Sequence, residues 1–256
     1  MAAAGTPTHV RRRVFPAETT VTNDLLSALL ATEYKRLLPR LEHVSLKRGE
    51  VIYRADQEVA HVYFPEDAVI AMVDTTSDRR TVEVGIIGHE GLVGINIFLG
   101  GVVTPDKAIV QLPGGAFRMK SKDLRQEVRF GSPLQRLLIG YTRTFLAVLG
   151  QSVACSQHHS VDQRLARWLL MLCDYAGSNE IYMVQQSIAA VLGVRRASVT
   201  VAAHTLQAAR VIAYSRGRIS VLNTPALQKK SCECYRFIRD QYRQLHAELP
   251  RLLSPK

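Results

Sequence analysis

The chain has 256 residues, a mass of 28.5 kDa, and 47% hydrophobic and 21% charged residues, which fits a soluble globular protein with room for two domains. Its 33 Lys and Arg against 22 Asp and Glu leave a net charge of +11, so nucleic acid is the first partner to test and an anionic membrane surface the second. No uninterrupted apolar run approaches the ~18 residues of a membrane span, and no signal-peptide core follows the basic residues 11–13, so we expect a cytoplasmic protein without a membrane partner.

The first half of the chain changes character twice. Residues 1–22, rich in Ala, Thr, Pro and Arg, are predicted to form a flexible basic arm. A helix is predicted from Asn23 to Leu41, because leucines recur there at helical spacing and Asn23 is a suitable N-cap. From Val44 to about Arg118, short β-like runs alternate with glycines and acidic turns, which indicates a small barrel or roll that can enclose a ligand. The runs are residues 51–53, 61–64, 69–73, 81–85 and 108–112.

A long helix is predicted to follow the barrel over residues 132–158. Its apolar residues recur at heptad-like spacing and form a continuous stripe. Packing on the chain's own sheet is the alternative, but a helix about 39 Å long between two domains favours contact with a second subunit. We therefore predict a homodimer formed through Leu134, Leu138, Tyr141, Phe145 and Val148.

The next segment predicts a change of direction. His159 is expected to lie at a hinge between the long helix and a C-terminal domain. Directly after it, Ser160 and Gln163 match a capping box, which predicts the start of another helix. At the end of the chain, residues 225–256 carry apolar side chains at helical spacing and predict a helical tail.

Residues 185–200 predict a helix-turn-helix. Ile188 and Leu192 give the first helix an inner face, and Gly193 supplies the sharp turn before a helix that opens with Arg195 and Arg196. An ordinary αα-hairpin is the alternative. The charge pattern favours DNA, because no acidic residue occurs between positions 180 and 233 whereas seven Lys and Arg do.

A wing is predicted beside this motif, within a winged domain that spans residues 159–224. Residues 211–222 have the pattern of two short strands around a glycine turn, with Arg216 and Arg218 at the tip to contact phosphates. The helix-turn-helix adds donors that suit phosphates and base edges. These predicted DNA-binding residues are Arg195, Arg196, Ser198 and Thr200, together with Gln186 and His204.

No metal, cofactor or enzyme site is expected. The four cysteines, at positions 155, 173, 232 and 234, lack the usual metal-ligand spacing. Cys155 and His159 lie four residues apart on a helix, with His158 beside them, but no further ligand is evident, so reduced structural thiols are expected. The barrel also contains the titratable residues His61, Glu66, Glu83 and His89. Their spacing does not match that of a nucleophile with its base, so no catalytic site is expected there.

The order of barrel, long helix and winged helix resembles the Crp/Fnr family of bacterial transcription regulators over about residues 23–224. The strongest pieces are residues 161–170, 192–200 and 214–219, with residues 62–65 and 83–91 in the barrel. The resemblance implies an α+β fold: an N-terminal cyclic-nucleotide-binding-like β-roll (a jelly-roll barrel) over residues 23–131, a dimerisation helix and a C-terminal winged helix-turn-helix. It also implies promoter DNA, a second copy of the chain and RNA polymerase as partners.

The resemblance assigns roles in the second helix of the motif. Arg196 matches an arginine that reads guanine in the cyclic-AMP receptor branch, and Ser198 matches a hydroxyl that binds phosphate. Ala197 and Val201 stand where both main branches carry a base-reading glutamate and an arginine, so a different target half-site is expected. Val184 replaces a polar residue that usually caps the first helix and holds a phosphate.

The resemblance also locates an effector pocket, and the residues there depart from the family pattern. The pocket is placed at Gly88, Glu90, Gly91, Asp106 and Lys107. Asp106 takes the position of the phosphate-binding arginine, where a carboxylate repels a cyclic phosphate. The N-terminal cysteine cluster of the Fnr branch is absent. Neither cyclic AMP nor an iron–sulfur cluster is therefore expected.

These features predict a homodimeric, sequence-specific transcriptional regulator that binds a palindromic promoter site. Its effector pocket is predicted to be degenerate or to take a molecule other than cyclic AMP. The alternative is a regulatory module whose primary activity is the binding of a small effector, such as a cyclic nucleotide.

Overall fold

The computed structural model describes residues 21–76 and 81–253, so most of the predicted arm lies outside the described residues. The last two residues of the predicted arm, Val21 and Thr22, contact the barrel domain. Val21 is buried in the core, and the Thr22 amide donates a hydrogen bond to Glu66 Oε1 at 3.3 Å. The last two residues of the predicted arm are therefore part of the folded domain.

The predicted helix from Asn23 to Leu41 is broken into three short pieces. They are α1 (Asp24–Ala28), α2 (Ala31–Leu37) and the 3₁₀ helix η1 (Leu38–Arg40). Asn23 is confirmed as N-cap, since its side chain accepts from the amides of Leu25 and Leu26. The prediction of one helix is wrong because Leu29 and Leu30 adopt extended backbone angles, which redirect the chain while Leu29 stays buried.

The barrel consists of two antiparallel sheets, as expected for a β-roll. One has the order β1 (Glu42–Leu46), β7 (Gly114–Lys120), β3 (His61–Pro65). The other has the order β2 (Val51–Tyr53), β6 (Lys107–Leu112), β4 (Val69–Thr75), β5 (Thr81–Ile87). Two short helices, α3 (Ile95–Phe98) and α4 (Ser121–Glu127), lie between and after these strands. The five predicted runs are all strands, whereas β1 and β7 were not among them, and both pair in the smaller sheet.

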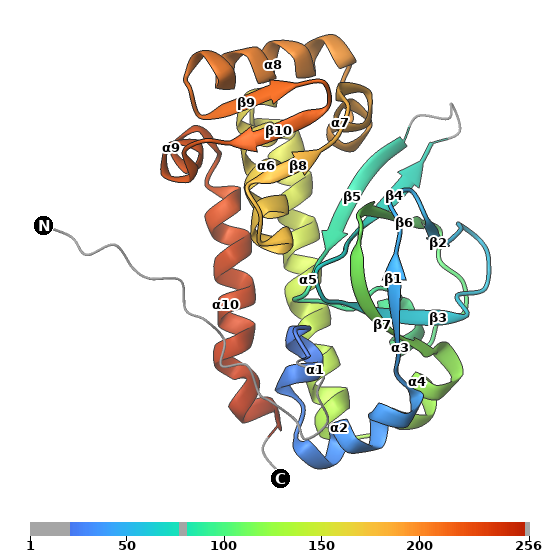
Figure 1. The fold of residues 1–256 in the computed structure, drawn as a ribbon. Coiled ribbons are helices and arrows are strands. Elements are labelled where there is room, and N and C mark those ends of the chain that lie inside the picture. The colour runs from blue at the N-terminus through green and yellow to red at the C-terminus, as the bar shows by residue number, and fades with distance from the viewer. Residues whose placement is uncertain (1–20, 77–80, 254–256) are drawn as a thin grey trace, which may run out of the picture.

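A long helix, α5 (Pro133–His158), joins the barrel to the C-terminal domain (Figure 1). The side chain of Ser132 caps it by accepting from the amide of Gln135 at 3.1 Å. The predicted tail forms α9 (Thr224–Lys230) and α10 (Cys234–Leu253), and α10 runs alongside α5. In the described part of the chain, α5 is the one helix whose length and composition would let it cross a membrane, a test that core helices of soluble proteins also pass.

The five residues predicted to form the dimer contact are buried within their own chain, from 0 to 5% exposed. They are Leu134, Leu138, Tyr141, Phe145 and Val148. Helix α5 packs against both α10 and β5, so most of its apolar surface is already covered. This corrects the expected dimer surface, because the stripe read from the sequence is the inner face of the helix.

The C-terminal domain is a winged helix-turn-helix. Helix α6 (Val161–Ala176) begins with the predicted capping box, and β8 (Glu180–Tyr182), α7 (Gln185–Leu192) and α8 (Arg196–Ala208) follow. The wing is the hairpin of β9 (Ile212–Ser215) and β10 (Arg218–Val221), to which β8 adds a third strand that was not predicted. Gly193 turns the chain with a left-handed φ of +62°, a conformation that costs glycine little.

Candidate nucleic-acid interface and barrel pocket

Helix α8 separates its residues into an inner and an outer face. The side chains of Val199, Ala202, Ala203 and Leu206 are buried, and the helix packs on α6 and α7. Residues four apart on the opposite side, Arg196, Thr200 and His204, are exposed. Three of the predicted DNA contacts thus share one solvent-facing surface of the helix.

The arginines at the start of this helix lie at the surface of the protein. Arg195 is the N-cap residue of α8 and Arg196 its first residue, and both are exposed. Among the described residues, neither forms an ion pair with a carboxylate, and neither does Arg216 at the wing tip. Free cations on one surface attract a polyanion without first having to break a contact.

The wing tip differs between its two arginines. Arg216 and Gly217 form the two-residue turn, with φ values of +50° and +81°, which is the usual geometry of a tight β-hairpin. Arg218 instead forms an ion pair with Glu180 on β8. Both partners are solvent-exposed, so this pair contributes little to stability. A phosphate must therefore compete with Glu180 for Arg218 but not for Arg216.

Some of the predicted DNA-binding residues also form a hydrogen bond within the protein or line a groove beside the barrel. Thr200 Oγ1 donates to Gln185 Oε1 at 2.9 Å, which links the two helices of the motif. Gln186, Arg195 and Ser198 line a groove whose opposite wall is Val82 of β5. A Cβ atom on Gly193 would lie 3.2 Å from Val82 Cγ2, so the turn of the motif sits closely on the barrel.

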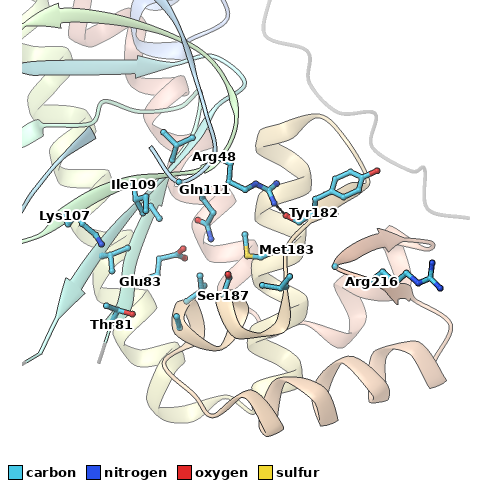
Figure 2. A pocket seen from close by; sticks show the side chains of 18 residues that line it. Arg48, Thr81, Glu83, Lys107, Ile109, Gln111, Tyr182, Met183, Ser187 and Arg216 are labelled. Atoms are coloured by element: carbon cyan, nitrogen blue, oxygen red, sulfur yellow. Dashed lines mark hydrogen bonds between the residues drawn. The ribbon is translucent and has the colours of Figure 1, made fainter. Parts of the chain in front are cut away.

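A cavity of about 620 Å³ lies between the barrel and the DNA-binding domain (Figure 2). The sheet contributes Glu83, Lys107 and Gln111, and the C-terminal domain contributes Met183 and Ser187. Burial raises the pKa of Glu83 to about 8, against the hydrogen bonds from Gln111 and Trp168 and the charge of Arg167. The cavity is thus bounded by a lysine and by a carboxyl group that is protonated at neutral pH.

Three of the predicted pocket residues hold the barrel against the helices. A Cβ atom on Gly91 would lie 2.4 Å from the Tyr141 hydroxyl oxygen, and one on Gly88 would lie 2.7 Å from the ring of Tyr175. Glu90 is buried, and its Oε1 accepts from the Gly88 amide at 3.2 Å. These residues therefore do not line an open site, which corrects the prediction, and of the five only Lys107 lines the cavity described above.

Asp106 is satisfied by neighbouring polar groups of the barrel. The carboxylate is buried, and the Tyr53 hydroxyl donates to Oδ2 at 2.9 Å. Thr104 Oγ1 donates to the other carboxylate oxygen, and Asn96 Nδ2 donates to Thr104 Oγ1 at 2.8 Å. The position that the resemblance assigns to a phosphate-binding arginine is therefore filled by an acid with its own donors.

The titratable residues of the barrel lie in separate contacts. Glu66 Oε2 is 2.9 Å from His43 Nε2, and His89 Nδ1 is 3.0 Å from Asp24 Oδ2. Trp168 Nε1 donates to Glu83 Oε1 at 3.2 Å, which links the barrel to α6. The contacts of these groups join structural elements to one another.

The expectation that Cys155 and His159 have no further ligand nearby is wrong. Cys232 and Cys234, at the junction of α9 and α10, lie next to them, and the four candidate ligand atoms are all within 4.8 Å of one another. Sequence spacing could not reveal this group, because α10 returns along α5 only in the folded chain. Cys173 on α6 is not part of it.

Comparison with known proteins agrees with both halves of this architecture. Residues 43–129 match the model of the cyclic nucleotide-binding domain family, and residues 163–230 match that of the Crp-like helix-turn-helix domain. No curated protein matches the chain in sequence.

Several solved structures share the fold at low sequence identity. FixK2 from Bradyrhizobium japonicum is 17% identical over 75% of this chain and 98% of its own, with a TM-score of 0.63. TTHB099, a CRP-family transcriptional regulator from Thermus thermophilus, is 18% identical over 74% and 96%, with a TM-score of 0.60. CLP, a c-di-GMP responsive global regulator from Xanthomonas campestris, is 15% identical over 75% and 99%, with a TM-score of 0.59.

The two domain matches together span more than half of the chain, in the order of barrel and then winged helix that the structure displays. The chain therefore belongs to the Crp/Fnr family of DNA-binding transcriptional regulators.

Proposed function

We propose that two copies of this chain bind a two-fold symmetric DNA site in the cytoplasm and regulate transcription together with RNA polymerase. The observation that carries this proposal is the exposed face of α8, which begins with two arginines that pair with no described acid. Arg196 is assigned to base recognition, and Arg216 and Arg218 are assigned to phosphates.

The dimer surface that we propose is the outer face of α5. Ile139, Leu146 and Val153 are 53, 62 and 66% exposed and lie seven residues apart, so they form one stripe along the helix. Gly150 lies on the same exposed face and has no side chain to hold a partner helix away. Such a stripe is suited to contact with the same stripe of a second copy, related by a two-fold axis.

The effector would act on the position of the DNA-binding domain. Gln186, Arg195 and Ser198 face β5 across a groove, so full contact with DNA requires this domain to move away from the barrel. His159, with extended backbone angles between α5 and α6, is the residue about which such a movement would occur. A ligand shifts this equilibrium only through different affinities for the two arrangements.

A second candidate function is the binding of a small effector in the cavity between the two domains. That cavity is the supporting observation, since a ligand there would touch Lys107 on the barrel and Ser187 on the DNA-binding domain together. The buried Asp106 network argues against a cyclic phosphate in the family's usual place.

Selection of bound fragments from a randomised DNA pool tests the first proposal. We expect enrichment of a two-fold symmetric sequence whose half-sites are about one helical turn, ~34 Å, apart. The Arg196→Ala variant serves as the matched control and should enrich a less specific sequence. Recovery of no enriched sequence with the unaltered chain would contradict the proposal.

Calorimetric titration separates the two candidate functions. Cyclic AMP, cyclic GMP and cyclic di-GMP are added to the full chain with and without the selected DNA. Tight binding of cyclic AMP would overturn the interpretation of Asp106. A cyclic nucleotide that binds without any change in DNA affinity would favour the effector-binding module.

A further inference from the structure

Three cysteines and one histidine from distant parts of the chain meet beside the start of α10. Cys155 lies in the last turn of α5, and His159 is the residue that ends this helix. Cys232 precedes α10 and Cys234 is its first residue. All three cysteines are buried, and His159 is partly buried. The cluster therefore joins the end of the long helix to the C-terminal tail.

The distances within the cluster fit a single tetrahedral ion. The four ligand atoms lie within 4.8 Å of one another, with Cys155 Sγ 3.6 Å from Cys232 Sγ and Cys234 Sγ 3.5 Å from His159 Nδ1. Bonds of about 2.3 Å to sulfur and about 2.0 Å to nitrogen place neighbouring ligands of a tetrahedral Zn²⁺ about 3.5–3.8 Å apart. Two measured separations thus lie at the values that zinc requires.

The surroundings of the ligands also suit a metal. His159 presents Nδ1 to the cluster while its Nε2 lies 3.1 Å from Glu233 Oε1, the carboxylate–histidine arrangement that orients metal ligands. Gln151 Nε2 donates to Cys234 Sγ at 3.0 Å.

We propose that Cys155, His159, Cys232 and Cys234 bind one Zn²⁺ ion per chain as a structural site. An iron–sulfur cluster distributes its ligands over different iron atoms, so it would need a wider arrangement of the four groups. A disulfide would use two of the cysteines and leave His159, its carboxylate partner and the remaining thiol without a role. Four closed protein ligands are typical of structural rather than catalytic zinc.

The position of the site gives the ion a role at the junction between the domains. The ligands surround the connection from α5 to α6 and hold α10 to it. Arg164, near the start of α6, donates to the carbonyl of Leu192 at the end of α7. Zinc binding would thus join the end of α5 to the start of α10 at the junction between the domains.

Metal analysis of the full chain tests the proposal. Reduced protein is treated with chelator, reloaded with Zn²⁺ alone, desalted and analysed by mass spectrometry for metal. We expect one zinc per chain in the unaltered protein and in Cys173→Ser, the matched control outside the cluster. Cys232→Ser and Cys234→Ser should lose affinity for zinc by more than about 100-fold, and Glu233→Ala by about tenfold.

Cobalt provides a second readout that does not depend on a variant. Co²⁺ in the unaltered chain should give the intense visible bands and the thiolate charge-transfer band of a tetrahedral sulfur-rich site. Zinc should also raise the thermal unfolding midpoint of the unaltered chain and of Cys173→Ser but not of Cys232→Ser. Weak octahedral cobalt bands, equal zinc content in all variants, or a Cys155–Cys232 disulfide formed in the presence of zinc would each overturn the proposal.

Discussion

The exposed face of α8, which we call the recognition face, differs from the barrel interior in whether its polar groups have partners within the protein. At the start of α8, Arg195 and Arg196 are exposed and pair with no described acid. In the barrel, Asp106 is buried and receives hydrogen bonds from Tyr53 and Thr104. Unpaired exposed charge is available to an external partner, whereas a buried polar group that is already satisfied gains little from one. The contrast supports the proposals that the exposed face of α8 binds DNA and that the position of Asp106 does not hold a cyclic phosphate.

The largest expected effect comes from the outer stripe of α5, because the proposed dimer would bring two copies of helix α8 to one DNA site. A Leu146→Glu variant should be monomeric and should lose about 100-fold or more of its affinity for a full palindrome, while its affinity for an isolated half-site stays the same. Light scattering and mobility shifts on the two DNA lengths measure this. Leu99→Glu, at a similarly exposed leucine on the barrel, is the control. A Leu146→Glu protein that remains a dimer would show that the subunits meet elsewhere.

The next effect distinguishes the arginines within the recognition face. Arg196→Ala should weaken binding to the preferred site by about 1–3 kcal/mol and relax the choice of one base. Arg216→Ala should weaken binding to all sequences alike. It should also reduce the slope of the logarithm of the binding constant against the logarithm of salt concentration by about one. Arg218→Ala should have a smaller effect, because Arg218 first has to leave Glu180. Titrations of specific and scrambled duplexes at several salt concentrations measure these changes, and equal loss of specificity in all three variants would contradict the assigned roles.

The barrel side of the contrast predicts a change in stability without a change in DNA binding. Tyr53→Phe removes one donor to the buried Asp106 carboxylate and should lower the free energy of unfolding by about 1–2 kcal/mol. Denaturant unfolding measures this, with the exposed Tyr182→Phe as control. A parallel loss of DNA affinity at a temperature where Tyr53→Phe stays folded would show that the two regions are more closely coupled than the contrast implies.

The smallest expected effect is a pH dependence at the boundary between the two regions. Burial raises the pKa of Glu83 from 4.5 to about 8, so its contribution to stability is complete below pH 4.5 and is lost as the pH rises through 8. Glu83→Gln cannot ionise, so its stability relative to the unaltered chain should be higher at pH 9 than at pH 6. Thermal unfolding at both pH values tests this difference.

His89 contributes a separate part of the same pH dependence. Burial alone would lower the pKa of His89, but the hydrogen bond with Asp24 and the nearby acids Glu90 and Asp174 raise it to about 9. Its stabilisation is therefore present below pH 6.5 and is lost as the pH rises through 9. Glu83→Gln should retain this part, so a variant with no remaining pH dependence between 6 and 9 would contradict the assignment to two groups.

Features set by neighbouring residues were predictable from the sequence alone. The capping box at Ser160, the turn at Gly193 and the wing hairpin depend on backbone chemistry over two to four residues, and the structure contains all three. The same holds for the strand runs, whose alternation and turns are local. The positive charge of the helix-turn-helix and wing was also predictable, because no acidic residue occurs between positions 180 and 233.

The sequence alone did not determine which residues far apart along the chain come into contact, or which face of a helix is buried. Heptad spacing on α5 identified an apolar stripe, but only the packing of α10 and β5 shows that this stripe is internal and that Ile139, Leu146 and Val153 are exposed. Tyr53 reaches Asp106 across 53 positions and Cys155 reaches Cys232 across 77. Local propensities act within a few residues, whereas burial and clustering depend on where distant segments return, and that is settled only when the whole chain packs.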